Sequence, residues 1–128
     1  MTGLTVTTPN DRDIVVTRFF RAPPALVFDA HTRPELVRRW QSGPDGWDWL
    51  VCEIDLKVGG AYRYRWRHAD GREIGFRGLY REITPPHGYV HTEVFEEDPS
   101  GGEVVGTVRF VGQEGGTLMT YTMRAPSA

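Results

Sequence analysis

Strict alternation of hydrophobic and polar positions organises the middle of the chain. Over residues 61–68 one parity holds Tyr62, Tyr64, Trp66 and His68, and the other holds Ala61, Arg63, Arg65 and Arg67. Alternation with period two is typical of a β-strand that has one covered face and one solvated face. Asp70-Gly71 then predicts a two-residue hairpin turn, and the returning strand places Ile74, Phe76, Gly78 and Tyr80 on one parity. The covered face therefore carries large aromatic side chains beside a glycine.

The rest of the chain predicts a helix pair and further strands. We expect strands at residues 13–20, 51–56, 61–68, 73–83, 89–96, 103–111 and 117–124, separated by segments rich in Gly, Pro and Asp. After the first strand, Pro24 suits the first turn of a helix, and Thr32 is expected to cap a second short helix. Residues 1–12 are expected to form a loose tail or a short edge piece, and residues 41–49 a loop. This order predicts an α+β fold with a curved seven-stranded antiparallel sheet and two short helices after strand 1.

Length and composition restrict the class of protein. A chain of 128 residues with 39% hydrophobic and 25% charged residues is that of one globular domain, spanning residues 1–128. The formal net charge of −2 gives no electrostatic basis for binding nucleic acid or an acidic membrane. No apolar run approaches the roughly 20 residues that span a bilayer, and no signal peptide is expected. The one cysteine, Cys52, is expected to be buried in a strand, and its lack of a disulfide partner fits a cytoplasmic protein.

The four histidines form no metal motif. Only His87 and His91 are spaced i, i+4, and they fall in a predicted turn and strand rather than in a helix, so neither a metal nor a cofactor is expected. His91 and Glu93 share one face of a strand and would form an acid–base pair if that face lined a cavity. The interpretation we favour places both in solvent and packs Val90, Thr92 and Val94 inward. No catalytic residue is therefore assigned.

A row of arginines marks the opposite face of the sheet. Its members are Arg63, Arg65, Arg67, Arg77 and Arg81. Because acidic residues are plentiful elsewhere in the chain, we expect a solvated face rather than an anion site.

Aromatic side chains are the best candidates for a binding site. The candidate ligand-binding residues are Trp40, Tyr62, Tyr64, Trp66, Phe76, Tyr80 and His91. Ligand pockets are lined by aromatic groups with a few polar handles, which Tyr and Trp supply together. The alternative is a plain aromatic core, and the pattern alone leaves both interpretations open.

Four motifs resemble one known family. They are Phe19-Phe20-Arg21-Ala22-Pro23 continuing to Val27-Phe28, Thr32, Pro34 and Trp40; Asp55-Leu56-Lys57-Val58-Gly59-Gly60; Gly78-Leu79-Tyr80-Arg81-Glu82-Ile83 with Pro85-Pro86; and Gly115-Gly116-Thr117. In this order they resemble the family homologous to the C-terminal domain of the heat-shock protein 90 ATPase activator, within the START-like (SRPBCC) superfamily. The resemblance covers residues 13–123.

The resemblance implies a helix-grip fold, in which the sheet wraps around a long C-terminal helix. That helix is absent from the sequence after Arg124, so we expect either a homodimer formed through the open face or a longer native chain. The superfamily implies binding of a small hydrophobic or aromatic molecule in the concave face, without catalysis. The family implies an association with chaperone ATPase activation and stress response. Two alternatives remain: a co-chaperone-like interaction module that binds a chaperone, and an enzyme of the polyketide cyclase or dehydratase kind.

Overall fold

Eight antiparallel strands form one sheet in the order β1-β2-β8-β7-β6-β5-β4-β3. The computed structural model describes residues 4–40 and 46–126, except the side chains of Leu4, Arg39, Trp40 and Pro99. The strands are β1 (Leu4–Thr7), β2 (Asp13–Phe20), β3 (Trp47–Ile54), β4 (Ala61–His68), β5 (Glu73–Thr84), β6 (Gly88–Phe95), β7 (Val104–Gln113) and β8 (Gly116–Arg124). Two helices, α1 (Pro24–Thr32) and α2 (Pro34–Trp40), lie between β2 and β3, and a 3-10 turn, η1 (Pro99–Gly101), lies between β6 and β7.

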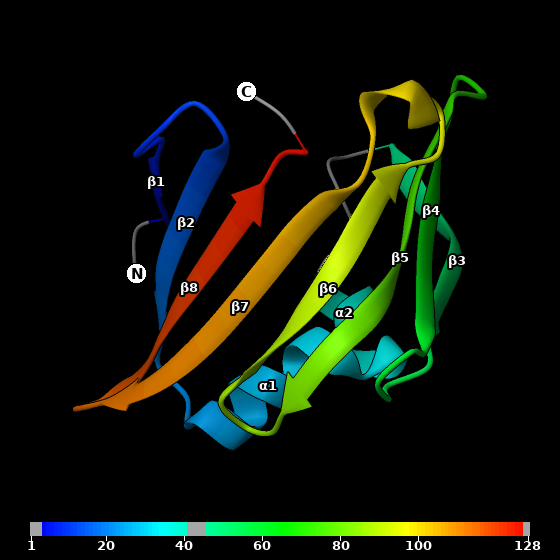
Figure 1. Ribbon diagram of the computed structural model, residues 1–128. Helices are drawn as coiled ribbons and strands as arrows, with labels where there is room; N and C mark the ends of the chain where they lie inside the picture. Colours follow the sequence, from blue (N-terminus) through cyan, green and yellow to red (C-terminus); the bar gives the residue numbers. More distant parts are fainter. Residues whose placement is uncertain (1–3, 41–45, 127–128) are drawn as a thin grey trace.

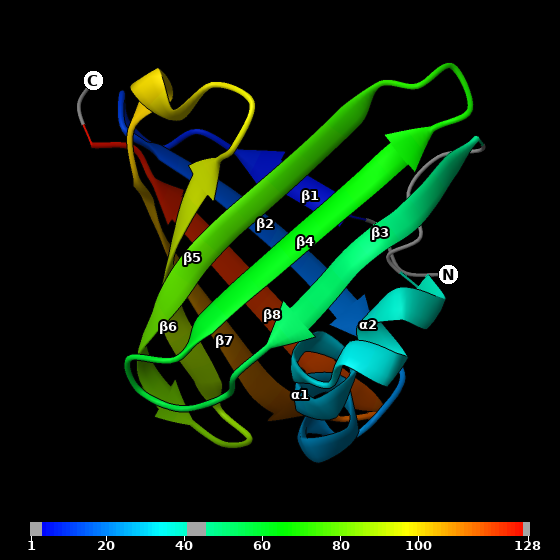
Figure 2. The ribbon, with the colours of Figure 1, turned by 90° about the vertical axis from the view of Figure 1, so that its right-hand side faces the viewer.

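The sheet is strongly curved, and its concave side faces the helices (Figure 1). In the turned view, β3, β4 and β5 lie in front of β2 and β8, with α1 and α2 closing one end of the space between them (Figure 2). Register shifts between Trp49 and Val51 and between Tyr80 and Glu82 interrupt the pairing. Such bulges bend a strand and increase its twist, which helps the sheet to curl.

Two strands differ from the sequence prediction. Leu4–Thr7 pairs with β2 as the edge strand β1, so the sheet has eight strands rather than seven, and the helices follow the second strand rather than the first. Strand β3 begins at Trp47, within the segment expected to be a loop. The reason lies in ring packing across the strand pair, because Trp47 contacts His68 at 5.0 Å and Trp49 contacts Trp66 at 4.5 Å between ring centroids.

The helix pair forms where the sequence predicts it, but its junction is different. Pro24 begins α1, whose residues Val27, Phe28 and His31 are buried against β7 and β8. Thr32 ends α1 and donates its hydroxyl to the carbonyl of Phe28, 2.8 Å away, so it does not cap α2. Instead the carbonyl of Arg33 accepts from the N–H groups of the first turn of α2. The two short helices therefore share one tight corner.

The β4–β5 turn is also one residue longer than predicted. His68 N–H donates to the carbonyl of Arg72 at 2.7 Å, and Gly71 alone in this turn has a positive φ, +95°. A type I′ turn would need positive φ at Asp70 as well. The glycine at the third loop position supplies the left-handed conformation instead.

A cluster of buried side chains lies beneath α1. Phe28, Tyr89, Val108 and Phe110 are buried there, and the rings of Phe28 and Phe110 meet edge to face at 6.1 Å. Cys52 is buried on β3, as predicted, with its sulfur 3.8 Å from the carbonyl of Pro34.

Candidate functional site

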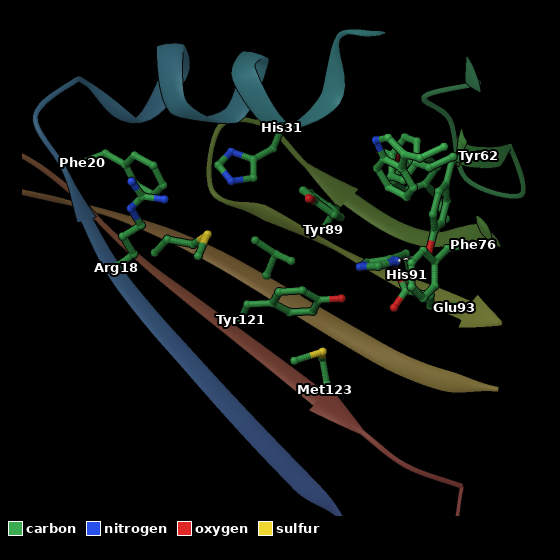
Figure 3. A pocket seen from close by; sticks show the side chains of 15 residues that line it. Arg18, Phe20, His31, Tyr62, Phe76, Tyr89, His91, Glu93, Tyr121 and Met123 are labelled. Atoms are coloured by element: carbon green, nitrogen blue, oxygen red, sulfur yellow. Dashed lines mark hydrogen bonds between the residues drawn. The ribbon is translucent and has the colours of Figure 1, made fainter. Parts of the chain in front are cut away.

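A cavity of about 370 Å³ occupies the concave face between the sheet and α1. One wall is aromatic and comes from β4, β5 and β6: Tyr62, Tyr64, Trp66, Phe76, Tyr80 and Tyr89. The other wall comes from β7 and β8 and holds Val108, Met119, Tyr121 and Met123. The inward parity of each strand builds these walls, because alternate side chains of a strand point to the same face. Figure 3 shows the side chains from both walls converging on one space.

Six of the seven candidate ligand-binding residues line this cavity. They are Tyr62, Tyr64, Trp66, Phe76, Tyr80 and His91. The seventh, Trp40, ends α2, and its side chain lies outside the described residues. The aromatic residues chosen from strand parity are therefore brought together around an unfilled space.

Tyr62, His91 and Thr92 form a hydrogen-bonded cluster in the aromatic wall. The Tyr62 hydroxyl lies 2.6 Å from the carbonyl oxygen of Thr92 and 2.9 Å from Nδ1 of His91. The carbonyl can only accept, so the hydroxyl donates to it, and the bond to His91 then requires a proton on Nδ1. This tautomer leaves Nε2 as the hydrogen-bond acceptor of the His91 ring.

Gly106 provides the space that this ring occupies. It lies opposite His91 in the β6–β7 pairing, and a Cβ atom there would be 2.7 Å from Nε2 of His91 and 2.8 Å from Cε1 of Tyr121. Any larger residue would push one of these two rings out of position. The glycine thus lets His91 and Tyr121 approach each other, with ring centroids 5.8 Å apart.

Burial sets the charge states in the cavity. It lowers the pKa of His91 to about 4, against a smaller opposing effect of the hydrogen bond to Thr92, so the imidazole is neutral at neutral pH. Burial also raises the pKa of the Glu93 carboxyl, partly offset by interaction with Tyr62. The pKa of each tyrosine in the wall is raised by burial as well, so the hydroxyls stay protonated.

His91 and Glu93 face the cavity, which contradicts the favoured sequence interpretation. Both line it, and the other parity of β6, including Val90 and Thr92, is buried too. Strand β6 lies in the middle of the sheet with cover on both sides, so its hydrophobic pattern does not identify the inward face. The acid–base pair considered from sequence is therefore present in the cavity wall.

The end of the cavity beside α1 holds residues that sequence reasoning missed. Arg18 and Phe20 come from β2 and His31 from α1. The guanidinium carbon of Arg18 lies 5.0 Å from the centroid of the Phe20 ring. The Nδ1 atom of His31 lies 2.8 Å from the carbonyl of Val27 and donates to it. Arg18 shares the parity of Val16 and Phe20, but both parities of β2 carry hydrophobic residues, so the sequence alone does not identify its inward face.

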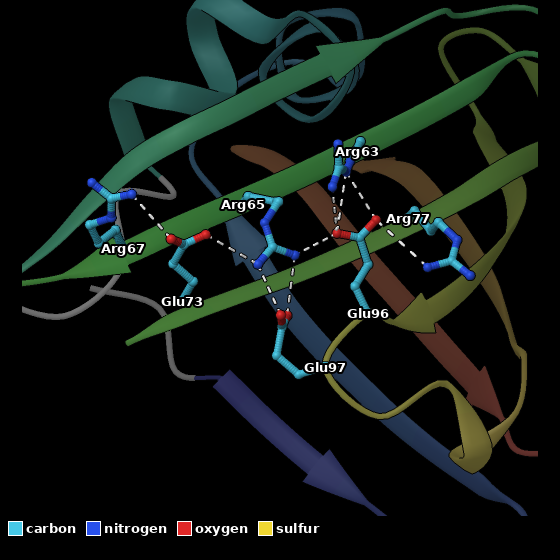
Figure 4. Close-up of polar contacts among 7 residues, drawn as sticks. All are labelled: Arg63, Arg65, Arg67, Glu73, Arg77, Glu96 and Glu97. Carbon is cyan, nitrogen blue, oxygen red and sulfur yellow. Dashed lines mark hydrogen bonds and ion pairs between the residues drawn. The ribbon is translucent and has the colours of Figure 1, made fainter. Parts of the chain in front are cut away.

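The arginine row lies on the outer face and is ion-paired (Figure 4). Arg63 and Arg65 contact Glu96, Arg67 contacts Glu73, and Arg81 contacts Glu103. The arginines are therefore paired with carboxylates of the same face, whereas the sequence interpretation expected them to be simply solvated. Asp55 pairs with Lys57 at 3.6 Å and not with an arginine of the row.

The described residues contain no group of three His, Cys, Asp or Glu side chains placed to hold a metal ion. None of the helices in this part of the chain has the length and apolar character needed to cross a membrane. The chemistry that the cavity offers is apolar and aromatic contact, hydrogen bonding, one acid and one arginine.

Solved structures confirm the fold. A crystal structure of a protein from Rhodobacter sphaeroides is 26% identical, with a TM-score of 0.89, covering 98% of this chain and 80% of that one. A solution structure from Staphylococcus epidermidis is also 26% identical, with a TM-score of 0.80, covering 97% of this chain and 77% of that one. An HSP90 activator from Plasmodium falciparum is 26% identical, with a TM-score of 0.66, covering 90% of this chain and 74% of that one.

Sequence comparison identifies the family. No curated protein matches the chain significantly. The sequence profile described as "Activator of Hsp90 ATPase homolog 1-like protein" matches residues 21–127, which is most of the chain. The resemblance seen in the motifs is thus confirmed, and the chain belongs to the Activator of Hsp90 ATPase homolog 1-like family.

Proposed function

We propose that the protein binds a small hydrophobic or aromatic molecule in the concave face of its sheet, without catalysing a reaction on it. The observation that carries the proposal is the cavity of about 370 Å³ with an almost continuous aromatic wall. Ligand pockets typically enclose roughly 300–1,000 Å³ and combine apolar walls with a few polar groups. The cavity meets both criteria, with Tyr62 and His91 among its polar groups.

The physical reason for binding is the apolar surface that the cavity leaves in contact with water. Tyr64, Trp66 and Phe76 are each only half-buried although they lie on the inward face. Each square ångström of apolar surface removed from water contributes roughly 25 cal/mol. A flat aromatic ligand would cover these rings and gain the offset and edge-to-face contacts that aromatic groups prefer.

The test uses N-phenyl-1-naphthylamine, a neutral aromatic dye whose fluorescence rises in apolar surroundings. We expect saturable binding of one dye per chain, and native mass spectrometry of freshly purified protein to reveal a co-purified small molecule. Met123→Trp would fill the cavity from β8 and should weaken dye binding at least tenfold. Absence of saturable binding by the unaltered protein would overturn the proposal.

Thr122→Trp is the matched control for Met123→Trp. Thr122 is the preceding residue of β8, has opposite parity and does not line the cavity. The same indole side chain then lies on the other face of the sheet, so dye affinity should stay within about twofold of the original value. Equal weakening by both substitutions would show that the dye binds outside the cavity.

A co-chaperone role is the second candidate, and the family description and the Plasmodium falciparum neighbour favour it. On this alternative, the protein binds a chaperone of the Hsp90 class and accelerates its ATPase. Purified chaperone with and without this protein would decide the matter. A rise in the ATPase rate that Met123→Trp leaves unchanged would support a role that does not depend on the cavity.

A polyketide cyclase or dehydratase activity is the third candidate, favoured by the inward position of His91 and Glu93. The neutral imidazole of His91 can accept a proton, and the carboxyl of Glu93, whose pKa is raised by burial, can act as a general acid or base. Turnover of a polyketide thioester that falls at least a hundredfold in His91→Gln and Glu93→Gln would support this role. Unchanged turnover in both variants would remove it.

A further inference from the structure

The charges that line the cavity are distributed unevenly. Among the described lining residues, Arg18 and Glu93 are the only arginine, lysine or carboxylic side chains. They come from strands on opposite sides of the curved sheet, Arg18 from β2 and Glu93 from β6. Figure 3 shows Arg18 beside Phe20 at one end of the cavity and Glu93 beside His91 at the other. The two ends therefore offer different chemistry to a ligand.

Arg18 lacks a carboxylate partner within the described part of the chain. Ten ion pairs of other arginines are present there, and none includes Arg18. Its guanidinium contacts the Phe20 ring instead. An arginine held against an aromatic ring keeps its charge and is preorganised, since less side-chain freedom is lost when a partner binds.

The neighbours of Arg18 do not cancel its charge. The pKa of His31 is lowered, mainly by burial and also by the positive charge of Arg18, so the imidazole stays neutral. The backbone carbonyl of Val27 already accepts from His31. This end of the cavity consequently carries one net positive charge against an apolar background.

A ligand that fills this end displaces the water around Arg18. If the ligand is neutral, the guanidinium loses hydration without compensation, which costs free energy. If the ligand carries a planar anionic group, the guanidinium can bind it with two parallel hydrogen bonds. The difference between the two cases selects for the anion. At the other end, the raised pKa of Glu93 and the neutral His91 disfavour an anion and accept an uncharged ring or hydroxyl.

We propose that the cavity takes an aromatic carboxylate, with the carboxylate on Arg18 and the rings against the aromatic wall of β4 and β5. This inference rests on the proposed binding function and adds the chemical class and the orientation of the ligand. The anion-binding residue is then on the inner face of β2, and the arginine row of the outer face takes no part.

The test compares 1-naphthoate with 1-naphthamide, which have the same rings and nearly the same shape but differ in charge. Each is used to displace N-phenyl-1-naphthylamine from the full chain at pH 7. Because charge-assisted hydrogen bonds are among the stronger ones, we expect naphthoate to compete about tenfold better than naphthamide. The advantage should shrink between low and high salt, whereas competition by naphthamide should change little.

Arg18 variants identify the residue responsible. Arg18→Gln should remove the advantage of naphthoate over naphthamide, with both competitors measured against the dye affinity of that same variant, and Arg18→Lys should retain part of the advantage. Arg21→Gln is the matched control, because Arg21 is exposed and does not line the cavity; it should leave the advantage intact. Melting curves show whether each variant is folded, and the salt series on the unaltered protein does not depend on any variant.

The outcomes separate the two proposals. Equal competition by naphthoate and naphthamide, or an advantage that survives in Arg18→Gln, would overturn the carboxylate proposal and leave dye binding standing. Failure of the dye to bind at all would overturn the proposed function, and the carboxylate proposal with it.

Discussion

The inner and outer faces of β4 differ in how their polar groups are satisfied. On the outer face, Arg63, Arg65 and Arg67 alternate along the strand and meet Glu73, Glu96 and Glu97 in a continuous network (Figure 4). On the inner face, Tyr62, Tyr64 and Trp66 border a cavity in which Arg18 and Glu93 have no ion pair among the described residues. The same strand thus has one face covered by ion pairs and one face that borders the cavity.

The comparison shows how one strand can be held by ion pairs on one face and border a cavity on the other. The carboxylate of Glu96, with 9% of its side chain exposed, joins Arg63 and Arg65 of β4 to the segment that follows β6. Burial opposes the charge of Glu96, but the hydrogen bonds from the two arginines lower its pKa. Because these ion pairs on the outer face join the strands, the side chains of the inner face are not needed to hold the strands together.

Gly78→Ala should cause the largest loss of stability, because the backbones of β5 and β6 approach each other closely at Gly78. A Cβ atom at Gly78 would lie 1.8 Å from the carbonyl oxygen of Thr92 and 2.7 Å from Cε2 of Tyr62. The backbone of Thr92 cannot move aside as a flexible side chain can, so strands β5 and β6 would have to separate. We expect a loss of about 3 kcal/mol or more in the free energy of unfolding, measured by urea denaturation.

Gly112→Ala is the control for this substitution. Gly112 lies in β7, and the nearest atom to an added Cβ would be Cγ of Pro24 at 3.4 Å, an ordinary contact. Stability should change by less than about 1 kcal/mol. Equal losses of stability in the two variants would show that the close approach of β5 to β6 at Gly78 does not limit the stability of the protein.

The pH dependence of stability should reveal the buried inner histidine. The pKa of His91 is about 4 in the folded protein and 6.5 in the unfolded chain. Below pH 6.5 the unfolded chain binds a proton that the folded protein does not, so stability falls as the pH drops from about 6.5 to about 4. The shift corresponds to a loss of roughly 3 kcal/mol over this window.

His91→Gln isolates this effect. The variant should show a shallower decline of stability between pH 6.5 and pH 4, as measured by urea denaturation at several pH values. The remaining dependence of stability on pH includes two other groups. Burial also lowers the pKa of His31, which makes stability fall with decreasing pH, whereas the raised pKa of Glu93 makes stability rise with decreasing pH. Parallel curves for the variant and the original protein would contradict the burial of a neutral His91.

The sequence alone predicts the difference between the inner and outer faces of β4, but it predicts less about the strands around β4. Period-two alternation separated the aromatic and arginine faces, because β4 has one face in solvent. The inward side of His91 could not be predicted, since β6 is buried on both faces from Gly88 to Thr92. Strand β1 was expected only as one of two alternatives, a loose tail or a short edge piece, because its short sequence LTVT lies in a polar segment and its pairing with β2 is a tertiary contact. Arg18 becomes a site residue only once β2 and α1 are placed together.

Arg65→Gln should have an intermediate effect and act only on the outer face. The Arg65 side chain is 13% exposed, and its hydrogen bonds to Glu97 and Glu96 raise its pKa. Its loss would leave Glu96 with fewer partners in a poorly hydrated position, at a cost of about 2 kcal/mol. Dye binding in the cavity should not change. Arg67→Gln is the control, because Arg67 is 56% exposed and its single, solvent-exposed pair with Glu73 should contribute much less to stability.

Tyr62→Phe should have the smallest effect, and it tests the inner face without changing its shape. The substitution removes one hydroxyl, which donates to the carbonyl of Thr92 and contacts His91. The carbonyl keeps a longer contact of 3.2 Å with Nδ1 of His91, so the expected loss is about 1 kcal/mol rather than that of a fully unsatisfied group. Binding of N-phenyl-1-naphthylamine should persist, because the ring remains in the wall. A loss as large as that of Gly78→Ala would mean that hydrogen bonds, and not backbone packing, hold the inner face together.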